Sequence, residues 1–184
     1  MEIRITTSHI LKVLLLLTWI IFIGLCVEAG AIIVNTFITL FINPDAVKNF
    51  WEGPDILVIY QLNTNHFVVL AIVMIIIAVL KAVMFYIILK LLSEKKLDFT
   101  KPFNTHLKDF ILKLSYLSFG IGLFTHCGSE FCLWLTSEGA KIASLESLNL
   151  TGSDVWFFMA IILLVITQII KKGIEIQSEN DLTI

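Results

Sequence analysis

The chain has 184 residues, of which 58% are hydrophobic and only 15% are charged, and its formal net charge is −2. Soluble domains average about 25% charged residues, and a soluble chain this apolar would need a larger core than 184 residues can enclose. The composition therefore excludes an ordinary soluble domain, and the lack of a basic stripe argues against direct binding of nucleic acid.

The first apolar segment runs from about Ile10 to Ile42 and contains a single carboxylate after Lys12, that of Glu28. As a straight helix this segment would be about 50 Å long, whereas the hydrocarbon core of a bilayer is about 30 Å thick. We predict an uncleaved transmembrane span over about residues 11–31 with an extension to residue 42. The excess length predicts a helix that tilts, projects beyond the bilayer or breaks near Glu28, and the polar residues near its end favour projection or a bend.

Three further apolar segments predict three more transmembrane helices. The loop that precedes them is rich in Pro, Gly and charged residues, and Ile56–Tyr60 is a candidate for a short interfacial element within it. The third of the four spans is the least apolar, so we expect it to be the helix most enclosed by protein. The predicted spans cover residues 66–92, 109–135 and 154–172, and a tail follows over residues 173–184.

Lysine and arginine residues are distributed unevenly over the predicted loops. If the N-terminus is cytoplasmic, the outer side carries only Lys48 and Lys141. The inner side then carries Arg4, Lys12, Lys90, Lys95, Lys96, Lys101, Lys108, Lys171 and Lys172. Short cytoplasmic loops of membrane proteins carry such an excess of positive charge. We therefore predict one all-α membrane domain, a four-transmembrane-helix bundle with both termini in the cytoplasm.

Several polar side chains fall inside the predicted spans, where a charge costs roughly 2.5–3.5 kcal/mol. Counting about 1.5 Å per residue from the end of each span places these side chains at two depths. The predicted outer layer consists of Glu28, His126 and Glu130. The predicted inner layer consists of Lys81, Ser115, Tyr116 and Gln168.

The outer layer has three interpretations, which the sequence leaves open. It is a structural network that fixes helix register, an ion or ligand site open to the outside, or a site for a divalent metal, since imidazole and carboxylate are common ligands. His126 and Glu130 share a helix face because they lie four residues apart. On the same count Glu28 and Lys81 differ in depth by about 15 Å, so a direct pair between them would need the first span to be shifted.

The sequence contains no motif that indicates catalysis. It lacks a recognised nucleophile motif, a His-Glu-x-x-His zinc motif and a glycine-rich phosphate loop. The three cysteines lack the spacing of a zinc site. We therefore predict no enzymatic activity, no cofactor and no assigned metal site.

The end of the chain, KKGIEIQSENDLTI at residues 171–184, resembles the ending of the bacterial multi-pass membrane family called domain-of-unknown-function family 2975. The segment Gly24–Gly30, the pair Pro102-Phe103 and the four-span pattern are similar as well, whereas the polar patch His126–Glu130 departs from the family pattern. The resemblance implies a protein of the bacterial cytoplasmic (inner) membrane without an established activity. It also implies a partner, a small cytoplasmic helix-turn-helix regulator.

The tail is the segment that we expect to bind such a partner. Its alternating apolar and polar residues at positions 174–177 are compatible with adding a strand to a partner, and the alternative is a frayed helix end. The candidate binding residues are Glu179, Asn180, Asp181, Leu182, Thr183 and Ile184. The function that we expect is a sensor or tether for the regulator. The alternatives are a small ion or solute transporter and an immunity protein against a membrane-active toxin.

Overall fold

The computed structural model describes residues 7–50, 56–93, 103–140, 142 and 144–181, and all regular elements in these ranges are helical. In chain order they are α1 (Thr7–Phe41), the 3-10 helix η1 (Pro44–Asn49), α2 (Leu57–Leu62), α3 (Thr64–Ser93), α4 (Thr105–Ser137) and α5 (Ser153–Asp181). The helices α1, α3, α4 and α5 are each long and apolar enough to cross a membrane. The predicted all-α architecture with four candidate membrane spans is confirmed.

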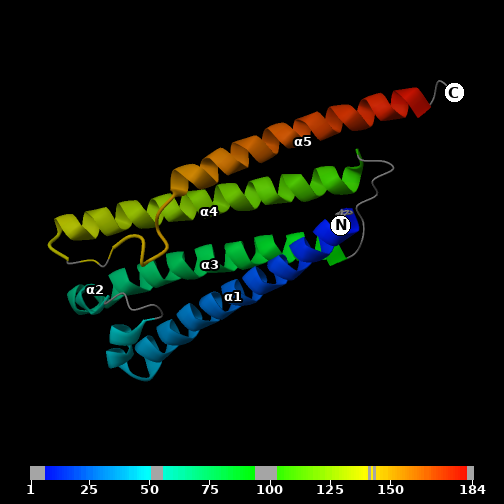
Figure 1. Cartoon of the computed structure of the whole chain (residues 1–184). Coiled ribbons are helices and arrows are strands. Elements are labelled where there is room, and N and C mark those ends of the chain that lie inside the picture. The colour runs from blue at the N-terminus through cyan, green and yellow to red at the C-terminus, as the bar shows by residue number, and fades with distance from the viewer. Residues whose placement is uncertain (1–6, 51–55, 94–102, 141, 143, 182–184) are drawn as a thin grey trace, which may run out of the picture.

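The four long helices lie in a row in the order α1, α3, α4, α5 (Figure 1). Successive helices run in opposite directions, and the most extensive pairing is that of α4 with α5. The two ends of the described chain lie at the same end of the long helices, and η1 and α2 lie at the opposite end of these helices (Figure 1). We call the end that carries η1 and α2 the outer end. The chain is thus a multi-pass membrane protein in which α1 and α5 form the two edges.

Helix α1 is continuous, so the chain does not break at Glu28. Its 35 residues give a length of about 52 Å, which exceeds the apolar thickness of a bilayer. The helix ends where the backbone amides of Ile42 and Asn43 both donate to the carbonyl of Ile38, at 2.9 and 2.8 Å. The side chain of Asn43 then accepts a hydrogen bond from the amide of Asp45 (3.0 Å) and caps η1. The excess length of α1 is therefore an outward extension that packs against η1.

The other three spans are each somewhat longer than the sequence predicts. Helix α4 begins where the side chain of Asn104 accepts a hydrogen bond from the amide of Leu107 (2.8 Å), which satisfies one of its free backbone donors. Helix α5 does not end at the basic pair Lys171-Lys172 but continues to Asp181. The tail is therefore helical over its described part, and the strand-like alternation at positions 174–177 does not produce a strand.

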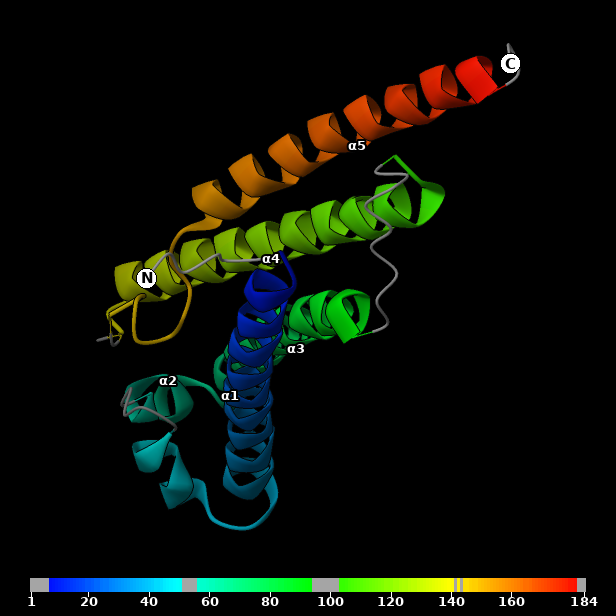
Figure 2. The ribbon, with the colours of Figure 1, turned by 45° about the vertical axis from the view of Figure 1, so that its right-hand side comes forward.

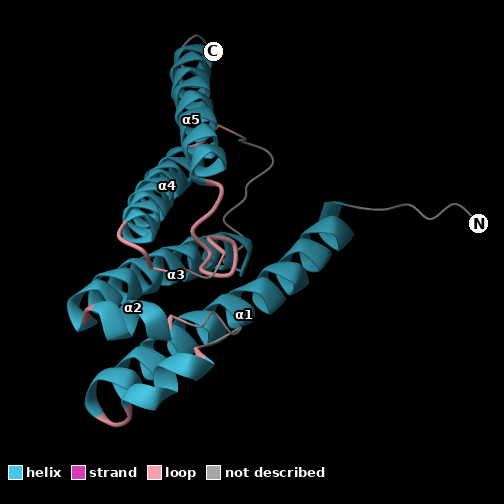
Figure 3. Ribbon diagram, turned by 90° about the vertical axis from the view of Figure 1, so that its left-hand side faces the viewer, coloured by secondary structure: helices cyan, strands magenta, loops and turns pink. Residues whose placement is uncertain are grey.

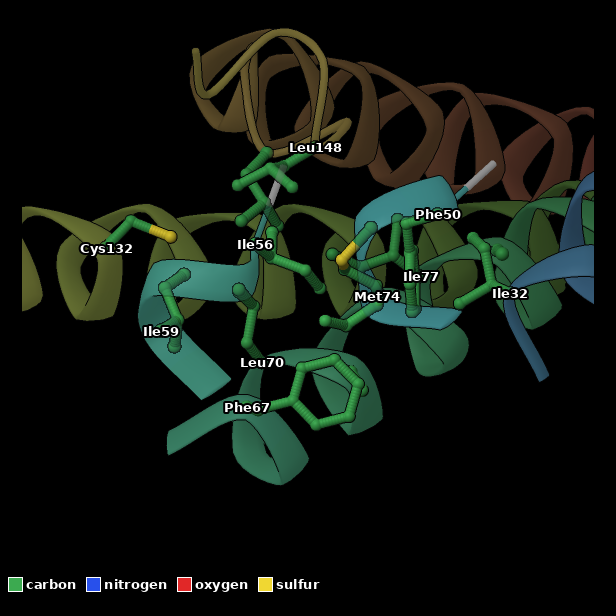
Figure 4. Close-up of a cluster of buried hydrophobic side chains, with 14 of the residues drawn as sticks. Ile32, Phe50, Ile56, Ile59, Phe67, Leu70, Met74, Ile77, Cys132 and Leu148 are labelled. Atoms are coloured by element: carbon green, nitrogen blue, oxygen red, sulfur yellow. The ribbon is translucent and has the colours of Figure 1, made fainter. Parts of the chain in front are cut away.

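The outer end of the molecule has a hydrophobic core of its own. This outer cap is formed by η1, α2 and the connection between α4 and α5, residues 138–152, together with the ends of the long helices. Figure 4 shows side chains from α2, α3 and this connection converging there. The fully buried side chains of the cap include Val47, Phe50, Ile56, Ile59, Leu148 and Leu150. The cap fixes the position of the α4–α5 connection.

Candidate functional site

An aromatic contact sets the register between α1 and α3. The ring centroids of Phe22 and Tyr86 lie 6.1 Å apart. Because the two helices are antiparallel, six residues outward on α1 leads to Glu28 and five residues outward on α3 leads to Lys81. These steps correspond to about 9 and 8 Å, so Glu28 and Lys81 lie at nearly the same depth.

The Glu28 carboxylate therefore acts electrostatically on the half-buried Lys81 ammonium group. Counting residues from the predicted ends of the spans separates these two groups by about 15 Å in depth. That count assumes that all spans begin and end at the same membrane planes. In the structure α1 is shifted relative to α3 and the two groups share a depth, but among the described residues no ion pair joins Glu28 to Lys81. An opposite charge at the same depth lowers the cost of placing either group inside a bilayer.

Asn149 supplies a hydrogen bond to the same carboxylate. Its side-chain amide donates to Oε1 of Glu28 at 2.7 Å, which joins α1 to the α4–α5 connection. Among the described residues Asn149 is the one non-glycine residue with a positive φ, 55°. Asparagine tolerates this left-handed conformation better than most residues do. We call Glu28, Lys81 and Asn149 the Glu28 cluster.

Buried leucines on both sides hold Asn149 in place. Leu148 and Leu150 are each 1% exposed, and the backbone amide of Leu150 donates to the carbonyl of Leu145 (2.9 Å). A Cβ atom added to Gly128 of α4 would lie 2.7 Å from Cδ2 of Leu150. The missing side chain at this position therefore lets the connection sit against α4. Figure 3 shows the connection folding back beside α3. The hydrogen bond from the Asn149 side chain joins this connection to Glu28 of α1.

The Glu28 cluster is suited to holding helices together by charge and hydrogen bonding. Its three residues come from α1, α3 and the α4–α5 connection, which are three separate parts of the fold. The strength of the tie depends on the charge of Glu28, because hydrogen bonds to a charged acceptor are stronger than neutral ones. Within the described ranges, no group of three or more His, Cys, Asp or Glu residues is placed to hold a metal ion.

The structure does not bring His126 and Glu130 to Glu28. Both side chains are exposed on α4, and no hydrogen bond or ion pair among the described residues connects either of them with Glu28. Helix α3 lies between α1 and α4 in the row, and this separates His126 and Glu130 of α4 from Glu28 of α1. A depth count gives the level of a residue along the membrane normal but not its neighbours in the membrane plane.

The residues of the predicted inner layer also lie in different places. Ser115 is buried, and its hydroxyl donates to the carbonyl of Ala160 in α5 (2.9 Å). Tyr116 and Gln168 are exposed, and Lys81 belongs to the Glu28 cluster. Adjacent residues of a helix point about 100° apart, so Ser115 and Tyr116 face different surroundings.

Three of the tail residues lie in α5 and three do not have a described position. Glu179, Asn180 and Asp181 form the last turn of α5, whereas Leu182, Thr183 and Ile184 lie outside the described residues. One turn earlier Lys172 Nζ lies 3.1 Å from Oε2 of Glu175. The tail is thus helical from Gly173 to Asp181, its described part.

The sequence reasoning missed Asn149 because it lies in a polar loop without a motif. The available signal was an asparagine between two leucines, which fits a left-handed turn residue with buried anchors on both sides. That signal predicts a turn but does not identify Glu28 as the group that the side chain contacts.

A comparison with protein families gives one match. Residues 56–184 match the model of a family described as "Protein of unknown function (DUF2975)". The matched range includes α2 to α5, and with them Lys81 and Asn149, whereas Glu28 precedes it. No curated protein and no solved structure is significantly similar to the chain.

Proposed function

The chain belongs to the DUF2975 family, and from that premise we propose that it is a membrane tether or sensor for a small helix-turn-helix regulator. In this proposal the protein resides in the bacterial cytoplasmic membrane with both termini in the cytoplasm. It acts by binding its partner at the C-terminal part of α5 and not by catalysis.

The projection of α5 beyond α4 is the observation that carries the proposal. Gly173 of α5 lies against the ring of Phe103. A Cβ atom added to this glycine would be only 2.7 Å from that ring. Phe103 lies two residues before the start of α4, so the eight residues from Ile174 to Asp181 extend α5 past that start. This extension is about 12 Å long, and Figure 2 shows it projecting from the row.

The chemistry of the extension is compatible with a basic partner. Glu175 and Glu179 are exposed and lie four residues apart, so their carboxylates share one side of the helix. Ile176 is 49% exposed and provides an apolar contact near them. Proteins that bind DNA carry basic surfaces, which an acidic helix complements in charge.

The other end of the same helix supports a sensing role. Helix α5 begins at Ser153, only four residues after Asn149 of the Glu28 cluster. One uninterrupted helix of 29 residues thus connects the outer cap with the extension over about 43 Å. A change at the Glu28 cluster would reach the extension as a movement of α5.

The test is co-purification with a small cytoplasmic helix-turn-helix regulator from the same bacterium. Full-length protein is compared with a chain truncated after Gly173 and with the double variant Glu175→Lys/Glu179→Lys. The matched control is Glu138→Lys, which reverses an exposed carboxylate at the outer end of α4. We expect the regulator to be recovered with full-length protein and with the control, and to be lost from the other two. Equal recovery from all four chains would refute a role for the extension.

A further inference from the structure

The side of α4 that packs against α5 is built from small and hydroxyl-bearing residues. A Cβ atom added to Gly122 would lie only 3.2 Å from Cβ of Trp156, so the two backbones approach closely at this level. The buried residues that follow one another along this side at steps of three and four are Ser115, Ser118, Gly122 and Thr125, and we call them the α4 seam. Small residues are typical of interfaces at which membrane helices pack closely.

The α4 seam contains more hydroxyl groups than the hydrogen bond that crosses it uses. The hydroxyl of Ser115 donates to the carbonyl of Ala160 in α5 at 2.9 Å. Ser118 and Thr125 are 0% and 1% exposed, and neither hydroxyl has a hydrogen-bond partner in the described part of the chain. A buried polar group without a partner loses its hydrogen bonds to water and is therefore costly.

These two hydroxyls also differ from the hydroxyls of other residues in the long helices. Four threonines donate to the carbonyl four residues earlier in their own helix, namely Thr18, Thr36, Thr136 and Thr167. Such a bond satisfies a hydroxyl without any neighbouring helix. The hydroxyls of Ser118 and Thr125 do not make it. The backbone of α5, which already accepts from Ser115, is a source of the acceptor that they lack.

The spacing of the α4 seam relates the unpartnered hydroxyl of Ser118 to the bond that Ser115 makes. Ser118 lies three residues outward from Ser115, which is about 4.5 Å along the helix, and one helical turn is about 5.4 Å. A displacement of α5 by about one turn toward the outer end would therefore bring the carbonyl of Ala160 from the level of Ser115 to that of Ser118. The same displacement would place Ala160 in front of Gly122, where Trp156 lies now.

Two contacts outside the seam fix α5 in its observed register. At the outer end Asn149, four residues before the start of α5, donates to Glu28 at 2.7 Å. At the inner end Gly173 lies against the ring of Phe103, which precedes α4 and is not part of that helix. Because α5 is one uninterrupted helix, a shift along its axis would separate both pairs. The Glu28 cluster and the register of α5 are therefore coupled.

We infer that the α4 seam gives α5 a second register, shifted about one turn toward the outer end, in which Ser118 replaces Ser115 as the donor to the carbonyl of Ala160. The shift withdraws the extension toward the membrane by about 5 Å of its length of about 12 Å. Displacements of one helical turn between packed elements occur in other switching proteins. The shift is the movement of α5 that the proposed sensing role needs, and its biological meaning rests on that role. It is measured on the protein alone, so its outcome does not depend on whether a regulator binds.

The first experiment measures the register by disulfide formation in proteoliposomes, in a chain with alanine in place of Cys26, Cys127 and Cys132. Gly122→Cys/Trp156→Cys reports the observed register, because a Cβ separation of 3.2 Å is close to that of a disulfide. Gly122→Cys/Ala160→Cys reports the shifted register, and the matched control Gly122→Cys/Leu163→Cys would require a shift of about two turns. We expect a disulfide in the first two chains and none in the control. A disulfide in the first chain alone, or equal yields in all three, would overturn the inference.

The second experiment biases the two registers in the Gly122→Cys/Ala160→Cys chain. Ser115→Ala removes the bond of the observed register and is expected to raise the rate of disulfide formation about threefold, given the mean strength of hydrogen bonds between membrane helices. Ser118→Ala removes the donor of the shifted register and is expected to lower that rate about threefold. Asn149→Gly releases the outer end of α5 and is expected to raise the rate.

The Gly122→Cys/Trp156→Cys pair is the folding control for this series, because its disulfide has to form in each background. Equal rates in the parent, Ser115→Ala and Ser118→Ala chains are the result expected if a bound water satisfies Ser118 in a fixed register. With the folding control intact, that result would refute the second register.

Discussion

The hydrogen bond between Glu28 and Asn149 makes a quantitative prediction about stability. This contact connects α1 with the α4–α5 connection across 121 positions of the chain. Asn149→Gly removes the amide and accommodates the positive φ, whereas Asn149→Ala removes the amide and leaves a Cβ atom in a left-handed conformation. Glu28→Ala removes the acceptor and also the charge that attracts Lys81.

The magnitudes follow from the geometry. A hydrogen bond to a charged group contributes roughly 1.5–3 kcal/mol, and because Glu28 is only half-buried we expect a coupling free energy of about 1 kcal/mol. A left-handed conformation costs an alanine roughly 1–2 kcal/mol. Asn149→Ala should therefore destabilise the protein by about 1 kcal/mol more than Asn149→Gly does. For a chain of this size that difference corresponds to a change in Tm of roughly 2–4 °C.

The assay is a double-mutant cycle measured as the free energy of unfolding in detergent micelles. The cycle compares Glu28→Ala, Asn149→Gly and the double variant with the parent chain. We expect the double variant to be less destabilised than the sum of the single variants by about 1 kcal/mol. Additivity within about 0.3 kcal/mol would show that the 2.7 Å contact contributes nothing and would refute this reasoning.

Two packing predictions concern α4. Gly128→Ala should lower the free energy of unfolding by about 1–3 kcal/mol because the new methyl group would meet Leu150, whereas Gly24→Ala, with nothing within 4 Å of its Cβ position, should be tolerated. Thermal unfolding of the two variants measures the difference, and equal stability would contradict the predicted clash. Ser115→Ala should cost about 0.6 kcal/mol because it loses an interhelical hydrogen bond. Ser118→Ala, whose buried hydroxyl has no hydrogen-bond partner in the described part of the chain, should be neutral or stabilising, and the reverse order would refute this assignment.

The sequence predicts the four helices well because each is a long apolar segment between polar loops. The observed bounds of α3, Thr64–Ser93, differ from the predicted span by only a few residues. The short element expected at Ile56–Tyr60 is also present, as α2. Apolar length is a local property of the sequence, and a membrane span depends on little else.

Apolar length does not predict which helices are neighbours in the membrane plane. Glu28 contacts Asn149 and not His126 because the order of helices in the row and the shift of α1 are set by packing. Packing depends on side chains from distant parts of the chain, such as Phe22 against Tyr86. Of the two alternatives for the tail, the helical end is the one seen over the described residues, because a short alternation of apolar residues at positions 174–177 is weaker than the tendency of a 29-residue helix to continue.

The most direct test of the account asks whether the two ends of α5 lie on opposite sides of a membrane. A chain without its native cysteines carries either Thr151→Cys, just before α5, or Ser178→Cys, in the extension, and both positions are exposed. A membrane-impermeant maleimide is then applied to intact and to permeabilised cells. We expect labelling of Thr151→Cys in intact cells and labelling of Ser178→Cys only after permeabilisation. Labelling of Ser178→Cys in intact cells would contradict a cytoplasmic extension and the proposed tethering of a regulator.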